Sequence, residues 1–340
     1  MTTVVAPGKL MIAGEYSVLA GGEALAMAVE PGVEAAAEPS EVWELARADS
    51  HVSWREGWPV PEDLRFAHAA LVAAREELGE PMAPLRIVTR TLGGVATGGG
   101  KPGAGGSASA TVAVVGAVFL AAGHALRDHA ILGPALRSHL AAQGGRGSGY
   151  DIATIVYGGL IRWRPAQVAA AGAHAPAYEA ARLPWPEGLH VLAGYTGRSA
   201  STSSFLAALD RAALADRAGL AAELHGLGAR VTRLIDAFAA ADVRAVLDGV
   251  RDCHAALCAW DRERRLGVMP PEVAQAIALA EACGAAAKVS GAGGGDSVLA
   301  FAPDAATLAA VASAWRDRGF DPLPFRRCEV GLHEKIPDRA

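Results

Sequence analysis

The alternation of apolar and polar positions divides the first half of the chain into strands and helices. Runs of β-branched and small apolar residues predict strands over 2–6, 24–30, 32–37, 42–48, 84–92 and 160–164. The Pro-Gly pairs at 7–8 and 31–32 are expected to stop the first strand and to form a turn between the second and third. Helical spacing predicts helices over 62–78, 108–123 and 128–143, and the second of these carries no charge and is expected to be buried.

Helical periodicity dominates the second half. Helices are predicted over 201–215, 220–240, 243–264, 272–283 and 305–318, and strands over 188–196, 285–289, 297–301 and 324–331. Between the halves, residues 165–186 are rich in Ala, Gly and Pro without a clear period, which is typical of an irregular connection. We therefore expect two domains, residues 1–165 and residues 186–340, in an α+β protein.

Composition narrows the classes of partner. The chain has 340 residues, 51% of them hydrophobic, and a net charge of −5 without a basic stripe, so nucleic acid is not an expected partner. The four cysteines form no CxxC pair, and the start of the chain does not resemble a signal peptide. The longest apolar run, 108–123, is short for a membrane span. These features favour a cytoplasmic protein without a membrane partner. The expected assembly is a monomer or a homodimer.

A glycine-rich loop stands between the predicted strand 84–92 and the buried helix. Its glycines allow backbone N–H groups to converge on one point, and the helix start adds unpaired N–H groups and a positive dipole end. This arrangement is typical of a phosphate site, in which Lys101 supplies a charge and Ser107 a hydroxyl for phosphate or Mg²⁺. The predicted nucleotide-binding residues are Lys101, Gly103, Ala104, Gly105, Gly106, Ser107, Ala108 and Ser109.

Two familiar phosphate loops fit this stretch poorly. A Walker A loop is excluded because Pro102 follows Gly100-Lys101 and Val95 stands where its first glycine belongs. A dinucleotide fingerprint matches the spacing of the glycines, but residues 93–102 separate it from the strand and no acidic residue stands about 20 positions on. That interpretation stays open, as does a plain surface linker before a core helix.

Three further segments carry candidate chemistry. A polar loop over 147–151 contains Asp151, which is either a functional carboxylate or the N-cap of a helix. A loop over 290–296 lies between two predicted strands and is either a second glycine-rich anion loop or a long hairpin turn. The hydroxyl-rich segment 199–204 precedes a helix and offers either capping or a phosphate site beside Arg198.

Three stretches of the chain, in this order, resemble the signatures of the GHMP kinase superfamily: residues 6–9 with 14–16, residues 101–109 and residues 288–296. Within it the chain is most similar to the phosphomevalonate kinase family, through residues 13–16, 147–151, 196–203 and 291–296. The glycine loop departs from the family at Gly106, where a serine is usual. Tyr16 stands where mevalonate kinases usually have histidine.

The resemblance implies an α+β fold of two domains, the first like ribosomal protein S5 domain 2 and the second ferredoxin-like, with the active site in the cleft between them. It implies an ATP- and Mg²⁺-dependent kinase that converts 5-phosphomevalonate to 5-diphosphomevalonate in the mevalonate route to isoprenoids. Two alternatives remain: a GHMP kinase acting on an alcohol such as mevalonate, homoserine or a sugar, and a nucleotide-binding regulator without catalysis.

The resemblance also assigns roles to individual residues. Lys9 and Asp151 are the expected catalytic residues, and Ser107 the expected Mg²⁺ ligand. The expected substrate-binding residues are Lys9, Glu15, Tyr16, Arg146, Ser148, Arg198, Ser201, Thr202, Gly291, Ala292 and Gly293. The second pKa of a phosphate acceptor is about 6, so the acceptor is largely ionised at neutral pH. It therefore needs neighbouring cations more than a strong base. The alternative for Lys9 is a solvated lysine at the surface. Lys288 could be an exposed charge at a sheet edge. No histidine is assigned a role.

Overall fold

The computed structural model describes residues 1–79, 82–93, 104–165, 178–197, 202–295 and 297–336. Its first sheet runs in the order β13-β1-β2-β5-β3-β4, with β12 and β6 also on β2 and β7 on β6. The strands are β1 (Thr2–Ala13), β2 (Ala24–Pro39), β3 (Glu44–Arg47), β4 (Ser53–Arg55), β5 (Leu85–Thr91), β6 (Leu160–Arg164), β7 (Glu179–Leu183), β12 (Arg326–Arg327) and β13 (His333–Glu334). The second sheet has the order β11-β8-β10-β9, from β11 (Asp321–Leu323), β8 (His190–Tyr195), β10 (Ser297–Ala302) and β9 (Ala286–Ser290).

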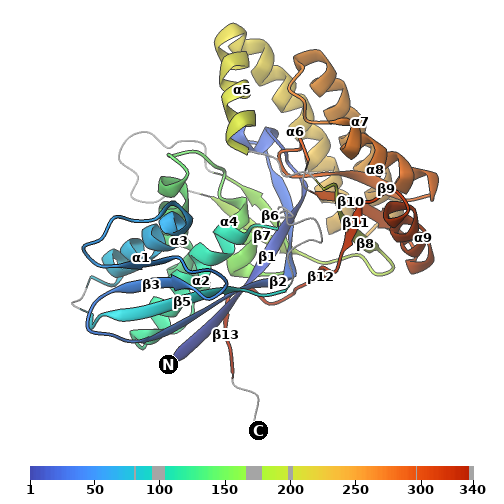
Figure 1. The fold of residues 1–340 in the computed structure, drawn as a ribbon. Coiled ribbons are helices and arrows are strands. Elements are labelled where there is room, and N and C mark those ends of the chain that lie inside the picture. Colours follow the sequence, from blue (N-terminus) through green and yellow to red (C-terminus); the bar gives the residue numbers. More distant parts are fainter. Residues whose placement is uncertain (80–81, 94–103, 166–177, 198–201, 296, 337–340) are drawn as a thin grey trace.

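Helices cover each sheet in its own half of the molecule (Figure 1). The first sheet carries α1 (Arg65–Leu78), α2 (Gly106–Ala121), α3 (Asp128–Ala142) and α4 (Tyr150–Tyr157). The second half contains α5 (Thr202–Ala215), α6 (Arg217–Ala239), α7 (Val243–Arg264), α8 (Pro271–Ala282) and α9 (Ala305–Arg316). The described part of the chain also contains two short 3-10 helices, η1 (Ser17–Ala20) and η2 (Glu62–Leu64). Within the described residues, no helix has the length and apolar character needed to cross a membrane.

Local sequence explains where several of these helices begin. Asp216, Asp242 and Asp304 each accept a hydrogen bond from the backbone N–H three residues on, which satisfies one of the unpaired donors of the first turn. The α2 helix is apolar on all sides and is accordingly buried between the first sheet and α1. The predicted buried helix is therefore confirmed.

The first two strands are longer than the sequence pattern predicts. β1 continues through Pro7-Gly8 and β2 through Pro31-Gly32, so the predicted stop and turn are wrong. The register shifts there, because Ala6 pairs with Val33 while Gly8 pairs with Val29. Three residues of β2 thus face one residue of β1, which is a bulge that bends the ribbon. Gly32 permits this close approach, since a Cβ there would lie 2.0 Å from the Ala6 carbonyl oxygen.

The chain crosses between its halves more often than the sequence predicts. The stretch predicted to be irregular contains β7, which pairs with β6. Of the predicted strand 324–331 only the short β12 forms a strand, and β13 follows after it, both paired with the first sheet. The division at 165 and 186 stays a prediction.

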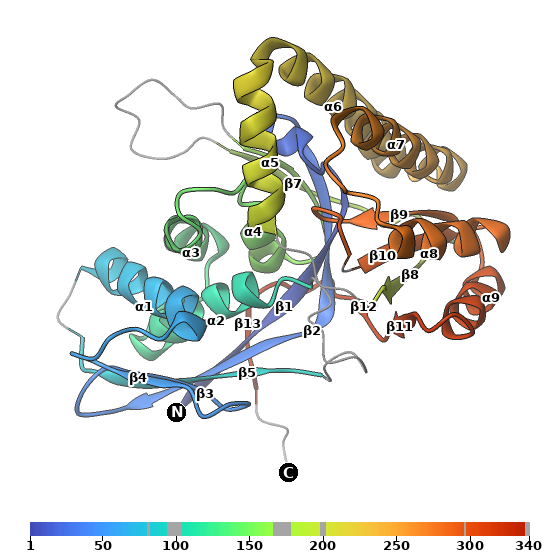
Figure 2. The ribbon, with the colours of Figure 1, turned by 45° about the horizontal axis from the view of Figure 1, so that its top comes forward.

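A shared apolar core joins the halves along the β1–β2 ribbon, which runs through the molecule (Figure 2). Leu10 and Ile12 of β1 are buried in the same cluster as Phe238 of α6 and Phe301 of β10. One strand therefore contacts the cores of both halves, and its side chains and backbone can position loops from each.

Candidate active site

Loops from distant parts of the sequence hydrogen-bond to one edge of β1. The backbone N–H of Lys9 donates to the Ala104 carbonyl at 2.9 Å. The hydroxyl of Ser109 donates to the Pro7 carbonyl at 2.7 Å, and that of Ser290 donates to the Met11 carbonyl at 2.9 Å. The glycine-rich loop before α2 and the end of β9 are thus both held against the strand that carries Lys9.

The start of α2 has the features of a phosphate site. Gly105 is its N-cap in the left-handed region, at φ 84°, and no side chain caps the helix. Gly106 and Ser107 are exposed in the first turn, where backbone N–H groups lack helical partners. Ala108 and Ser109 are buried, and the Ser109 hydroxyl bonds to backbone carbonyls. Their contact with a nucleotide stays a prediction, and Lys101 and Gly103 lie outside the described residues.

Lys9 lies between this loop and α4. Its aliphatic stem packs on Gly105, where a Cβ would lie 2.9 Å from Lys9 Cγ, and its Nζ lies 5.4 Å from the centre of the Tyr150 ring. Burial raises the pKa of Tyr150, Lys9 opposes this, and the charges of Asp151 and Glu15 add to it. Tyr150 is therefore a neutral hydroxyl among charges. The alternative of a solvated surface lysine is wrong for Lys9, which is half-buried.

Asp151 lies in the first turn of α4, whose N-cap is Gly149 in the left-handed region, so Asp151 does not occupy the N-cap position. Its Oδ1 accepts the N–H of Ile152 at 2.9 Å, and its Oδ2 lies 3.7 Å from Nδ1 of the buried His139. Sequence reasoning assigned a role to neither His139 nor Tyr150. Only Tyr150, adjacent to Asp151 in a polar loop, carried a signal that could have identified it.

A buried ion pair joins Glu15, which follows β1, to Lys288 of β9. Lys288 is fully buried and also donates to the Val289 carbonyl at 2.7 Å, so an exposed edge charge is wrong for this residue. Burial raises the pKa of Glu15, and the Lys288 ammonium acts against that rise. In this structure the Glu15 carboxylate pairs with Lys288. A contact of Glu15 with substrate stays a prediction.

Tyr16 fixes the loop that follows β9. Its φ of 60° and ψ of −47°, with Ser17 N–H donating to the Glu15 carbonyl at 2.6 Å, define a strained γ-turn. The strain is held by tertiary contacts, since the hydroxyl donates to the Ala292 carbonyl and the ring lies 4.9 Å from that of Trp260. Burial raises the pKa of Tyr16.

The loop 290–296 connects two antiparallel strands, with Ser290 opposite Ser297, so its hairpin geometry is confirmed. It also packs closely on the residues before α8. Gly294 donates its N–H to the Val268 carbonyl at 2.8 Å, and a Cβ at Gly293 would lie 2.6 Å from the same oxygen. An additional anion-binding role for Gly291, Ala292 and Gly293 stays a prediction.

On the expected acceptor side, Arg146 pairs with Asp210 of α5 at 2.6 Å, and both side chains are about half exposed. This ion pair joins α5 to the loop that precedes α4. Ser148 accepts a hydrogen bond from Trp163 Nε1 at its carbonyl oxygen, at 2.8 Å. Thr202 begins α5, whereas Arg198 and Ser201 lie outside the described residues. The substrate contacts predicted for these residues stay predictions.

The metal ligands that the described side chains of the site offer suit a metal ion held mainly by substrate phosphates. Among the described residues, no group of three or more His, Cys, Asp or Glu side chains could hold a metal ion. The exposed Ser107 hydroxyl at the α2 start fits a single protein ligand for Mg²⁺, which usually keeps waters and phosphate oxygens in its shell.

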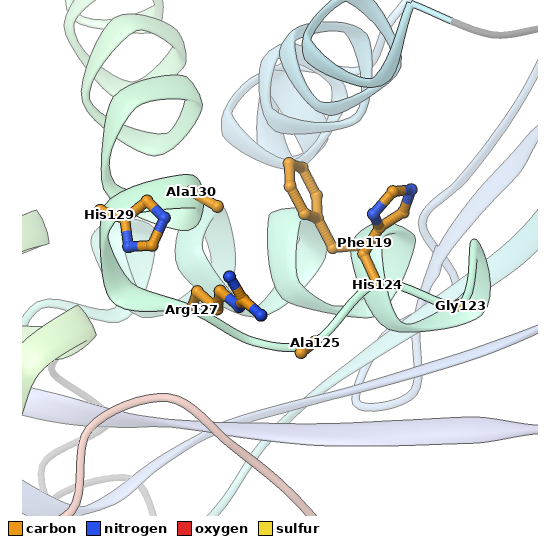
Figure 3. A pocket seen from close by; sticks show the side chains of 7 residues that line it. All are labelled: Phe119, Gly123, His124, Ala125, Arg127, His129 and Ala130. Carbon is orange, nitrogen blue, oxygen red and sulfur yellow. The ribbon is translucent and has the colours of Figure 1, made fainter.

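A cavity of about 350 Å³ lies elsewhere, between the end of α2 and the start of α3 (Figure 3). Its lining includes Phe119, His124, Arg127 and His129. Because α2 has 16 residues, the cavity lies roughly 24 Å from the glycine loop at the other end of this helix. It is therefore separate from the residues gathered on β1.

Known proteins are similar to this chain in sequence and in fold. The family model for the C-terminal part of GHMP kinases matches residues 234–321. The phosphomevalonate kinase of Streptomyces sp. (strain CL190) is 30% identical over 369 residues, covering 96% of this chain and 97% of the relative. The solved Lin0012 protein of Listeria innocua is 26% identical with a TM-score of 0.87, covering 98% of this chain and 99% of its own.

The Streptococcus pneumoniae phosphomevalonate kinase, solved with phosphomevalonate and AMPPNP, is 21% identical with a TM-score of 0.82, over 96% of this chain and all of its own. The structural neighbours and the family model show the GHMP kinase fold, and the Streptomyces relative shows the class, a phosphotransferase. Through its Streptomyces relative, the chain belongs to the phosphomevalonate kinase family. The fold and the family predicted from the sequence are both confirmed.

Proposed function

We propose that this enzyme transfers the γ-phosphoryl group of ATP to the phosphate of 5-phosphomevalonate in a Mg²⁺-dependent reaction, giving 5-diphosphomevalonate and ADP. The observation that carries the proposal is the place of Lys9, between the glycine loop at α2 and the Tyr150-Asp151 pair at α4. The name of the Streptomyces relative and the ligands of the Streptococcus structure support the substrate pair.

The reaction brings two anions together, so charge neutralisation is the main task. An oxygen of the acceptor phosphate forms a bond to the γ-phosphorus, the bond from that phosphorus to the bridging oxygen breaks, and ADP leaves. Because the second pKa of a phosphate monoester is about 6, the acceptor is largely ionised at neutral pH and requires no strong base. Asp151 then orients Lys9 and the acceptor and removes no proton.

Each part of the site has a separate task in this proposal. The first turn of α2 offers unpaired N–H groups and the Ser107 hydroxyl to the nucleotide phosphates. Mg²⁺, when bound at Ser107, neutralises phosphate charge. Lys9 places its ammonium where the donor and acceptor phosphates meet. Arg146 exchanges Asp210 for the acceptor phosphate, and Arg198 assists it.

ADP release by the purified enzyme tests the proposal. The assay compares 5-phosphomevalonate with mevalonate, homoserine and several hexoses, each with ATP and with or without excess EDTA. Turnover confined to 5-phosphomevalonate and abolished by EDTA is expected. Turnover on an alcohol would refute the acceptor, and nucleotide binding without turnover on any of these acceptors would refute the reaction.

A further inference from the structure

His139 is a buried polar residue beside the proposed catalytic aspartate. It lies on α3 with 3% of its surface exposed, and its ring packs on that of Phe66 at 5.1 Å. Its Nδ1 faces Asp151 Oδ2 at 3.7 Å, and its Nε2 faces the side-chain nitrogen of Gln143 at 3.5 Å. Each nitrogen of the ring therefore has one polar neighbour.

The Asp151 carboxylate determines which nitrogen of the ring donates. An ionised carboxylate only accepts hydrogen bonds, so Nδ1, which faces Asp151 Oδ2, is the nitrogen that carries the proton in this contact. The other ring nitrogen, Nε2, is left to the side-chain amide of Gln143 at 3.5 Å.

We propose that His139 is a positioning residue for Asp151, which its Nδ1–H holds in the orientation needed for phosphoryl transfer. This inference rests on the proposed function, since it assigns the partner of the Asp151 carboxylate. One oxygen of that carboxylate already accepts the N–H of Ile152 at 2.9 Å. The imidazole restrains the other oxygen, so the carboxylate keeps a single plane beside Lys9 and Tyr150. At 3.7 Å this restraint is a charge–dipole contact.

A purely structural role predicts a different pattern of variants. The ring is buried against Phe66, so an apolar side chain of similar size would serve packing at least as well. His139→Leu keeps that packing without a donor. His139→Asn loses packing but places its amide nitrogen near the position of Nδ1. The two variants therefore separate the two roles.

Steady-state kinetics and thermal unfolding of both variants test the proposal. His139→Leu is expected to lower kcat by about 10- to 100-fold with little change in the KM for ATP, by analogy with other outer-shell partners of active-site groups. His139→Asn is expected to retain more of the kcat while unfolding at a lower temperature than His139→Leu. In an Asp151→Ala background, His139→Leu should cause no further loss. Equal losses of kcat in the two variants, or a further loss in that background, would overturn the proposal.

A second measurement needs no substrate. Spectra that correlate ¹⁵N and ¹H of the imidazole rings, with the His139 signals assigned by their loss in His139→Asn, report which nitrogen carries the proton. We expect a proton on Nδ1 of His139, whereas neutral histidine in water favours Nε2. A ring that carries its proton on Nε2 alone would overturn the proposal. Failure of the wild-type enzyme to use 5-phosphomevalonate would instead refute the proposed function, and the spectra would still decide the state of His139.

Discussion

The ion pair between Glu15 and Lys288 offers a quantitative test of how the two halves are held together. Lys288 is fully buried, and the side chain of Glu15 is 5% exposed. Lys288→Met removes the ammonium while keeping most of the volume, and leaves the carboxylate buried without its partner. Breaking a buried pair on one side costs about 3–5 kcal/mol, because an uncompensated charge stays in the interior.

The expected shift in unfolding temperature follows from the length of the chain. An unfolding entropy of about 2.1 cal/mol/K per residue gives roughly 0.7 kcal/mol/K for the whole protein. A loss of about 3–5 kcal/mol therefore lowers the midpoint by roughly 4–7 °C. Replacing Glu15 by Gln in the same protein removes the orphaned charge and should recover part of this loss.

The loss should also depend on pH, with a defined sign. Burial already raises the pKa of Glu15 above its ordinary value of 4.5, and removal of Lys288 raises it further. The folded variant then binds a proton that the unfolded chain has released, so its stability falls as pH rises from 4.5 through the folded pKa. The difference in midpoint between wild type and Lys288→Met should consequently be larger at pH 8 than at pH 5.

Calorimetry at the two pH values provides the measurement, and Lys335→Met is the matched control. Lys335 pairs with Glu34 at 2.5 Å on the first sheet, but its side chain is 54% exposed. Such a pair contributes at most about 1 kcal/mol. If the unfolding midpoint of Lys288→Met is as high as that of Lys335→Met, the buried pair does not hold the two halves together. The same conclusion follows if the midpoint falls by the same number of degrees at both pH values.

Three further predictions concern the reaction, each followed through the rate of ADP release. Ser107→Ala should lower kcat about 10-fold and raise the Mg²⁺ concentration required, because one metal ligand is lost; an unchanged Mg²⁺ dependence contradicts this role. Asp151→Asn should lower kcat about 100-fold with the fold intact, and near-normal turnover would reduce Asp151 to a structural residue. Lys9→Met should lower kcat by about 100- to 1,000-fold with a smaller change in ATP affinity, measured by calorimetric titration. An unaltered kcat would remove Lys9 from the site.

The elements that the sequence predicts well are those with a continuous run or a regular period of apolar positions, and α7 has the predicted bounds, 243–264. The uncharged run that forms α2 and the strand at β6 lie within two residues of their predicted bounds. Prediction fails where a local signal has a tertiary use. Pro31-Gly32 has the composition of a turn, yet β2 passes through it because a bulge opposite Pro7 absorbs the extra residues.

The residues of the candidate site also divide into those that the sequence could predict and those that it could not. Lys9 and Ser107 stand in short motifs that resemble those of the family, so the sequence was enough to propose their roles, which stay predictions. The partner of Asp151 lies on another helix, and no periodicity links His139 to it. Lys288 did carry a signal that went unused. It interrupts a strand whose other four residues are apolar or small and buried on both faces, so its charge required a buried partner.

The geometry of β1 explains why motifs so far apart in sequence meet. Successive residues of a strand direct their backbone groups to opposite edges, so residues 7, 9 and 11 use the same edge. β2 pairs along one edge of β1, and among the described strands β13 pairs the other edge at Val4 and Val5. Beyond Val5, the glycine loop, the start of α2 and the end of β9 supply the partners for that edge. Proline fits at position 7 because only its carbonyl is used there. The start of α2 and the end of β9 are therefore held by hydrogen bonds against the strand that carries Lys9 in the absence of substrate.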